Sequence, residues 1–330
     1  MKAHIVKMHF TAPLHLGSKE AMLENTLQHI PSDVVFSALC NVYRHLYGKQ
    51  ALESLLAEQA QSAGFLLSSA FPYYRDAYFL PRPLNFDLTR YGFEPKKAKR
   101  VKYLEYNLMH RVLAGKFQAA DLENYVAEAV QGLLLPREYQ GLKICREVEI
   151  PRVALDSLTA ASNIYYFNQV TFTREAGLYC LVRCAPELWG RLRTCFRVLG
   201  DEGIGGDRTS GKGGFTVEFP GELAFPQLGQ PASHVLLSLY YPSSDEAGSL
   251  EAEYSLIKRS GYVYSSEETG LRRKSVTMLA EGAVVYADSP PVGKLVDLTP
   301  PGFDKHKVWR NGLAFTVASA LGKGGGEDAG

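Results

Sequence analysis

Alternating hydrophobic and polar positions predict a strand near the start of the chain. Residues 5–10 read IVKMHF, in which a lysine and a histidine separate apolar side chains, and this period of two is typical of a strand with one buried face. From Ser32 to Leu46, apolar residues recur at helical spacing instead, and Gly48 follows them as a C′ residue. Because Ser32 is a favourable N-cap, we expect a strand, a loop and a capped helix in succession.

The middle of the chain breaks this regularity and then restores it. Residues 81–143 are interrupted by prolines and charges, so we expect an insertion that holds only helical fragments, chiefly around residues 119–134. The last part of the chain, about a hundred residues, is rich in strand patterns and suits a second, smaller sheet-based unit. Between the insertion and this last part, the pattern predicts a hairpin of 170–173 with 178–182, a helix from Pro186 to Gly200 and a strand over 215–219.

Composition narrows the class of protein. With 330 residues, of which 46% are hydrophobic and 22% charged, the chain can bury a substantial core and is long enough for two modules. Its formal net charge is only +1, so any nucleic-acid partner must be held by local basic clusters rather than by an overall field. The N-terminal segment is too polar for a signal peptide, and no apolar run has the length of a membrane span. We therefore expect a soluble, cytoplasmic protein.

The cysteines give no sign of a metal site. None of the five forms a CxxC pair, and Cys180 and Cys184 lack a nearby histidine. We expect reduced, buried thiols and no metal or nucleotide cofactor. The five are Cys40, Cys145, Cys180, Cys184 and Cys195.

The most informative segment is a glycine-rich loop over residues 203–214, with the sequence GIGGDRTSGKGG. Residues 206–212 match most of the phosphate-loop pattern GxxxxGK[ST], but Gly213 stands where a hydroxyl should coordinate magnesium. A predicted helix precedes the loop and a predicted strand follows it, which is the reverse of what a phosphate loop needs. The dinucleotide pattern GxGxxG fails as well, because Arg208 occupies its third glycine position.

What remains is a loop that combines glycines with cations. Glycines let the backbone approach a ligand closely and expose N–H groups, while the loop's arginine and lysine add charge. This combination suits a sugar–phosphate chain, and the alternative is a loose connector. The candidate contacts are Gly203, Gly205, Gly206, Arg208, Thr209, Ser210, Gly211, Lys212 and Gly213.

At this point the sequence resembles the RAMP superfamily of CRISPR proteins, whose signature is a glycine-rich loop between the second helix and the fourth strand of a ferredoxin-like fold. Further segments narrow the resemblance to the subunit of type III-A (Csm) effector complexes that caps the 5′ end of the guide, and they cover nearly the whole chain. The segments are APLHLG at 12–17, SD at 32–33, SAFP at 69–72, LPRP at 80–83, KKAKRVK at 96–102, PRVALD at 151–156, GLY at 177–179, KRSGY at 258–262 and HKVWRNG at 306–312.

The resemblance implies an α+β fold of two ferredoxin-like (RRM-like) RAMP modules. The first module is expected to span residues 1–220, with 81–143 as a large insertion and 154–168 as a thumb hairpin that wedges against RNA. The second, β-rich module is expected over 221–322, and the glycine-rich tail at 323–330 is expected to be disordered.

The resemblance also implies a function. Such a subunit binds the repeat-derived 5′ tag of the CRISPR RNA (crRNA) without catalysis, docks on the large polymerase-like subunit and abuts the backbone RAMP subunit. It serves antiviral defence and meets target RNA only indirectly. Two alternatives stay open: a metal-independent CRISPR endoribonuclease of the same superfamily, and the equivalent cap subunit of the Cmr complex. In the endoribonucleases of the superfamily, the glycine loop lies close to the C-terminus, whereas more than a hundred residues follow it here.

A basic cluster in the expected insertion is a second candidate RNA contact. Its cations are interleaved with aromatic residues, as in proteins that hold the backbone of single-stranded RNA and stack its bases. The alternative is a solvated charged face. The cations are Lys96, Lys97, Lys99, Arg100 and Lys102, and the aromatic residues are Tyr91, Phe93, Tyr103 and Tyr106.

The remaining candidates come from the resemblance. His15, Gly17 and Arg152 lie in the shared segments and are expected to contact RNA. A catalytic His15 would act as a general acid–base in a nuclease, but we favour a structural hydrogen bond. For the wedge of the thumb the candidates are Leu158, Ile164, Tyr165 and Tyr166, which equally fit the strands of an ordinary core.

Overall fold

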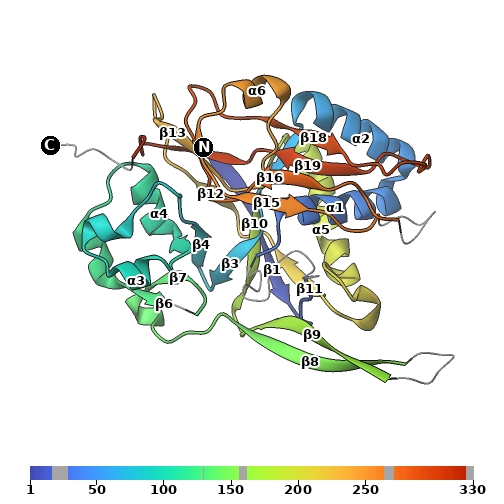
Figure 1. Ribbon diagram of the computed structural model, residues 1–330, viewed down its shortest axis with the longest axis horizontal. Coiled ribbons are helices and arrows are strands. Elements are labelled where there is room, and N and C mark those ends of the chain that lie inside the picture. The colour runs from blue at the N-terminus through green and yellow to red at the C-terminus, as the bar shows by residue number, and fades with distance from the viewer. Residues whose placement is uncertain (17–28, 129, 156–161, 264–270, 325–330) are drawn as a thin grey trace.

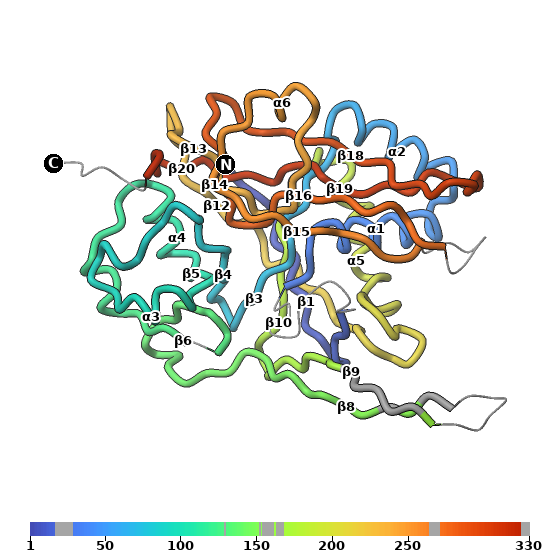
Figure 2. Tube along the Cα trace, in the orientation of Figure 1, coloured from blue at the N-terminus to red at the C-terminus, as the bar shows by residue number. Residues whose placement is uncertain are grey.

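The computed structural model describes residues 1–16, 29–128, 130–155, 162–263 and 271–324, which form a mixed α+β fold (Figures 1 and 2). The helices are α1 (Ser32–Tyr47), α2 (Lys49–Ser62), α3 (Pro95–Ala98), α4 (Tyr106–Leu113), α5 (Pro186–Glu202) and α6 (Ser244–Gly248). The strands are β1 (Lys2–Phe10), β2 (Phe65–Leu67), β3 (Phe71–Tyr74), β4 (Ala77–Pro81), β5 (Tyr103–Glu105), β6 (Tyr125–Glu128), β7 (Leu133–Pro136), β8 (Cys145–Leu155), β9 (Ser162–Phe172), β10 (Ala176–Cys184), β11 (Phe215–Glu218), β12 (Glu222–Ala224), β13 (Ser233–Leu236), β14 (Ala252–Glu253), β15 (Leu256–Arg259), β16 (Val276–Leu279), β17 (Val284–Val285), β18 (Gly293–Asp297), β19 (Trp309–Leu313) and β20 (Thr316–Ser319).

A ten-stranded sheet is the centre of the molecule. Its path runs β11-β1-β10-β3-β4-β5-β7-β6, with β12 also paired to β1 and β2 to β10. The pair of β5 and β7 is parallel, and the other pairs along this path are antiparallel. At its middle, Ile5 lies opposite Leu181 and Val6 opposite Cys180.

The alternation along β1 places apolar side chains on both faces of this sheet. Ile5 joins one core, whereas Val6 and Met8 join the other. Helices α1 and α5 cover the second face, where Phe36 and Phe196 are buried. The predicted strand and helix at the start of the chain are thus confirmed, as are the helix that begins at Pro186 and the strand that follows the glycine loop.

The C-terminal part of the chain packs against the main sheet. It contributes the sheet β14-β17-β13-β20 and the two-stranded ribbons β15-β16 and β18-β19. Val235, Leu237 and Phe315 are buried in the same core as Phe71 of β3. The two parts of the chain therefore share a hydrophobic core, and the burial of that core fixes one part against the other.

The insertion differs from the expectation of helical fragments alone. Among the described residues of 119–134, only Ala119–Asn124 is helical, as a 3-10 turn, and the strands β6 and β7 follow it. With β5 they extend the main sheet beyond β4, and Leu134 is fully buried in this extension. The end of this segment forms a strand rather than a helix because the apolar run of β7 is buried between its neighbouring strands β5 and β6.

The predicted hairpin of 170–173 with 178–182 is wrong. Strand β9 pairs along its whole length with β8, from Cys145 opposite Phe172 to Leu155 opposite Ser162. Strand β10 is apolar on both faces and lies inside the main sheet, between β1 and β3. A strand of this kind is buried on both sides, so it leaves no edge for β9.

The start of α1 also differs from the prediction. The N-cap position is Pro31, and Ser32 makes no capping bond. The backbone N–H of Ser32 instead donates to Ser69 Oγ (2.8 Å), and the Ser32 hydroxyl accepts from the Leu239 N–H (3.1 Å). The serine that the pattern assigned to local capping therefore joins the two parts of the chain.

Candidate nucleic-acid interface

The glycine-rich loop connects α5 to β11 and is bonded to the segment that follows β1. The N–H of Gly206 donates to the His15 carbonyl (2.8 Å), and the N–H of Gly213 donates to the Pro13 carbonyl (2.9 Å). Within the loop, the N–H of Ile204 donates to the Gly213 carbonyl (3.0 Å). These bonds fix the backbone at both ends of the loop.

The glycines of the loop serve two purposes. Gly205 and Gly213 have positive φ angles of 96° and 73°, and a Cβ at these positions would collide with the carbonyl oxygens of His15 and Ile204. These two glycines are therefore required by the packing of the protein against itself, whereas the sequence alone suggested close approach of a ligand. Gly211 also has a positive φ, of 73°, but open space surrounds it at the exposed tip beside Thr209 and Ser210. The tip therefore presents exposed backbone to a ligand.

A long hairpin lies beside this loop. Strands β8 and β9 extend away from the body of the protein (Figure 1). At its base, Lys212 Nζ donates to Gln169 Oε1 (2.6 Å), and His15 Nδ1 donates to the Asn168 carbonyl (2.7 Å). Leu14 and Val170 form an antiparallel bridge at the same place. The structure thus brings together the glycine loop, the segment after β1 and the base of the hairpin.

Several predicted contacts lie on this hairpin or next to it. Arg152 is on β8 directly opposite Tyr165 of β9, and Tyr166 is opposite Pro151. Gly17 and Leu158 lie outside the described residues. Contact of these residues with RNA stays a prediction.

The lysine-rich cluster is not brought to the same place. It surrounds α3 in the insertion, on the opposite side of the view from the hairpin β8–β9 (Figure 2). Lys97 pairs with Glu94 (2.9 Å), and both side chains are more than half exposed. The interleaved aromatic residues pack into the core of the insertion: Tyr103 is 7% exposed, and Tyr91 packs against Phe117. The stacking role that the interleaving suggested for these rings is therefore not supported, and contact of the cations with RNA stays a prediction.

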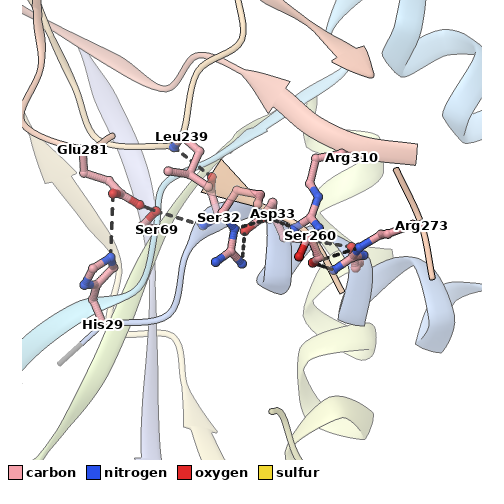
Figure 3. A network of polar contacts seen from close by, with 11 residues as sticks. His29, Ser32, Asp33, Ser69, Leu239, Ser260, Arg273, Glu281 and Arg310 are labelled. Atoms are coloured by element: carbon pink, nitrogen blue, oxygen red, sulfur yellow. Dashed lines mark hydrogen bonds and ion pairs between the residues drawn. The ribbon is translucent and has the colours of Figure 1, made fainter. Parts of the chain in front are cut away.

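Three arginines from the C-terminal part meet at the start of α1, a feature that sequence reasoning missed. Arg259 donates to both carboxylate oxygens of Asp33 (3.0 and 3.3 Å), and Arg310 forms an ion pair with the same carboxylate. Arg273 donates through Nε and Nη2 to the Ser260 carbonyl (3.2 and 2.9 Å), which also accepts from Arg310 (3.3 Å). We call Arg259, Arg273 and Arg310 the arginine cage, of which Figure 3 labels Arg273 and Arg310.

The cage faces the glycine loop across a cavity of about 300 Å³. Asp33 is fully buried and Arg310 is 1% exposed, so the buried charge is compensated within the protein. Arg208 lines the same cavity from the glycine loop. The only sequence signal for the cage was the presence of Arg259 and Arg310 in two of the segments that carry the RAMP resemblance.

A second set of polar contacts lies on the other side of Ser32. The Ser69 hydroxyl donates to the Glu281 carboxylate, and His29 Nε2 lies 3.7 Å from the other oxygen of that carboxylate (Figure 3). Glu281 lies in the turn between β16 and β17, so these contacts again join the two parts of the chain. We call His29, Ser69 and Glu281 the Glu281 clamp.

Neither a metal site nor a membrane span is found in the part of the chain that the structure describes. No group of three or more His, Cys, Asp or Glu residues there is arranged to hold a metal ion. No helix in those ranges combines the length and the apolar character needed to cross a bilayer.

Comparisons with known proteins agree with this architecture. Residues 230–319 match the family model of the CRISPR Csm4 C-terminal domain. The protein named CRISPR system Cms protein Csm4 from Thermococcus onnurineus is 30% identical over 296 residues, which cover 89% of this chain and 92% of that protein. Its namesake from Mycobacterium tuberculosis is 28% identical over 293 residues, which cover 87% of this chain and 89% of that protein.

Solved structures show the same fold. A chain of the Csm3-Csm4 subcomplex in the type III-A CRISPR-Cas interference complex superposes with a TM-score of 0.67 at 18% identity, covering 96% of this chain and 98% of that chain. A chain of the Csm1-Csm4 cassette in complex with cA4 gives 0.64 at 24% identity, covering 98% and 100%. From the 30% identity along most of its length, together with the match of its C-terminal part, this chain belongs to the Csm4 family of type III-A CRISPR Csm complex subunits.

Proposed function

We propose that this chain binds the repeat-derived 5′ tag of the crRNA as a non-catalytic subunit of its Csm complex. One observation carries the proposal: the exposed tip of the glycine loop, the segment after β1 and the base of the hairpin β8–β9 are bonded into one surface through Lys212, Gln169, His15 and Asn168. Hydroxyls, backbone N–H groups and cations gather on this surface, and such groups bind a phosphodiester backbone.

The fold supports a RAMP-type reading of the first part of the chain. Strands β11, β1, β10 and β3 are neighbours in that order, and α1 and α5 both pack on one face. This is the arrangement of a β-α-β-β-α-β unit, so we assign residues 1–220 to a ferredoxin-like module with the insertion 81–143 and the thumb 154–168. We assign 221–322 to a second, β-rich module, in whose described residues α6 is the one helix.

Membership in the Csm4 family supports assembly with protein partners as well as binding of RNA. Solved assemblies pair Csm4 with Csm1 in one case and with Csm3 in another. We infer that this chain docks on the large polymerase-like subunit and abuts the backbone RAMP subunit, and that it meets target RNA indirectly. Membership in the Csm4 family also favours the Csm over the Cmr complex.

The position of His15 supports a binding role over a nuclease role. Its Nδ1 donates to a backbone carbonyl, that of Asn168, at 2.7 Å. This bond ties the segment after β1 to the hairpin, which is a structural task for the ring. The proposed function calls for no metal or nucleotide cofactor.

The double variant Arg208→Ala/Lys212→Ala tests the proposal. We expect its affinity for a single-stranded RNA that carries the 5′ tag to fall about tenfold, because charge-assisted bonds to phosphate are lost. Its melting temperature should stay close to that of the wild type. The matched control Arg111→Ala/Lys116→Ala removes the same two charges from the insertion and should bind like the wild type.

Fluorescence anisotropy with a labelled RNA measures the affinity. In the same samples, with EDTA present, the RNA should be recovered at full length. Unchanged affinity of the loop variant, or specific cleavage that His15→Ala abolishes, contradicts the proposal.

A further inference from the structure

The cavity between the arginine cage and the glycine loop has the size and lining of a site for one nucleotide. Its volume of about 300 Å³ is at the lower end of the range for ligand pockets. Three parts of the protein surround it: the start of α1, the buried end of the glycine loop and the C-terminal segments that carry the arginine cage. Its lining includes Asp33, Ser37, Asn41, Gly203, Gly205, Gly206, Arg208, Arg259, Tyr262, Arg273 and Arg310.

The charge of the lining favours an anion. Four arginines and one aspartate are the charged side chains among the described lining residues. The guanidinium group is planar and carries several donors in a fixed fork, so it suits phosphate oxygens. A cavity lined in this way has the chemistry to bind a phosphate group.

The cage is held in place by the protein. The Asp33 carboxylate accepts from Arg259, which is 13% exposed, and the Ser260 carbonyl accepts from Arg273 and Arg310. Side chains that are already ordered lose little conformational entropy when a ligand binds. The cage is therefore preorganised.

A base can stack next to the cage. Tyr262 lines the cavity and is 61% exposed, so its ring is accessible at the mouth. A larger cavity of about 410 Å³, with a mainly apolar lining that includes Phe36 and Trp309, adjoins this one and shares Ser37, Asn41 and Arg273 with it. Splayed bases of single-stranded RNA are commonly held by aromatic stacking beside a basic surface.

We propose that the arginine cage binds one phosphate of the crRNA tag, with an adjoining base stacked on Tyr262. The proposal rests on the proposed function and adds a specific subsite to it. An acidic peptide from a neighbouring subunit would also find complementary charge here. RNA is favoured because Gly203, Gly206 and Arg208 belong both to this cavity and to the glycine loop, so a strand that lies on the loop reaches the cage without leaving the protein surface.

Single-site methylphosphonate substitution in the tag RNA, which removes one phosphate charge at a time, tests this subsite with the full chain. Wild type should lose about tenfold in affinity at the linkage that occupies the cage. Arg259→Gln and Arg273→Gln should each bind unmodified RNA about tenfold more weakly. For these variants, a methylphosphonate at that same linkage should cause no additional loss of affinity. Arg111→Gln, the charge-matched control from the insertion, should keep the wild-type profile. Tyr262→Leu should weaken binding, whereas Tyr262→Phe should not.

The outcomes separate this inference from the proposed function. If wild type fails to bind the tag, both are overturned. If wild type binds and the Arg208→Ala/Lys212→Ala variant is weakened, but both cage variants keep wild-type affinity and the wild-type profile, the inference alone is overturned. Cage variants that keep their RNA affinity but no longer co-purify with the other Csm subunits would overturn it in favour of a protein-docking site.

Discussion

Asp33 is the residue whose role depends most on its surroundings. By its position it is an acidic residue in the first turn of a helix, where a carboxylate interacts favourably with the helix dipole. In the fold it is fully buried and forms ion pairs with Arg259 and Arg310, the first of which lies 226 residues away in the chain. The main role of Asp33 is therefore to compensate the charge of these guanidinium groups. Its interaction with the helix dipole is secondary.

Replacement of Asp33 should therefore be costly. We expect Asp33→Asn to lower the free energy of unfolding by about 3–5 kcal/mol, because the buried Arg310 loses its carboxylate. The control Asp121→Asn breaks an Arg–Asp pair of 2.8 Å in which Arg111 is 47% exposed, and it should cost at most about 1 kcal/mol. Urea unfolding followed by fluorescence measures both. Equal losses would show that the buried pair has no special role.

Among the elements, the glycine loop and the lysine-rich cluster have similar sequence signals but different surroundings. Both combine cations with residues typical of RNA-binding segments. The loop is bonded to two other segments and opens toward a cavity lined by arginines. The cluster begins on α3 and continues beyond its end, and the neighbouring aromatic rings pack against the hydrophobic core. The loop therefore has the surroundings of a binding site, whereas the aromatic rings beside the cluster are engaged in packing.

The salt dependence of RNA binding distinguishes these two elements. Each phosphate contact with a single strand contributes about 0.7 to the slope of log K against log salt. We expect the Arg208→Ala/Lys212→Ala variant to lower the magnitude of the slope by about 1.4. Neutralising all five cations of the cluster should also lower the magnitude, by up to about 3.5 when each cation contacts one phosphate. A slope equal to that of the wild type in the cluster variant would instead show that the cluster is a solvated face.

At the scale of the whole molecule, the two parts of the chain are joined by shared cores and by buried polar contacts. The Glu281 clamp illustrates the second kind. Burial acts to raise the pKa of the Glu281 carboxyl, but the charge of the nearby His29 and the hydrogen bond from Ser69 outweigh burial, so the pKa lies below its usual value of 4.5. The ionised form is therefore the one that stabilises the folded protein.

This shift predicts how stability depends on pH. Because the folded pKa is depressed, the stabilisation is present above the unfolded pKa of about 4.5 and is lost as the pH falls through the folded pKa. We expect Glu281→Gln to lose less unfolding free energy than wild type between about pH 6 and about pH 3. Glu94→Gln, which changes an exposed carboxylate, should behave like wild type. Parallel curves for wild type and Glu281→Gln would contradict the prediction.

Local sequence pattern was sufficient where neighbouring residues decide the outcome. The alternation over β1, the helical spacing over α1 and the position of Pro186 each gave the correct element. The pattern failed where a distant strand competes. The segment expected to be helical instead forms strand β7, which is buried and pairs with β6. Ser32 likewise bonds to Ser69 and Leu239 rather than capping its own helix. The glycine loop was identified as a candidate site, but the cage opposite it was not.

The sequence by itself determined the α+β class, several strands and helices of the first part, the glycine loop as the main candidate site and the family resemblance. These properties depend on periodicity and on motifs of a few residues, which are local. Tertiary structure alone decided that Gly205 and Gly213 pack against the protein itself, that the insertion extends the main sheet, and that Arg259 and Arg310 from the C-terminal part pair with Asp33. The physical reason is that charge compensation and core burial depend on distances in space, and the residues that form the cage lie far apart along the chain.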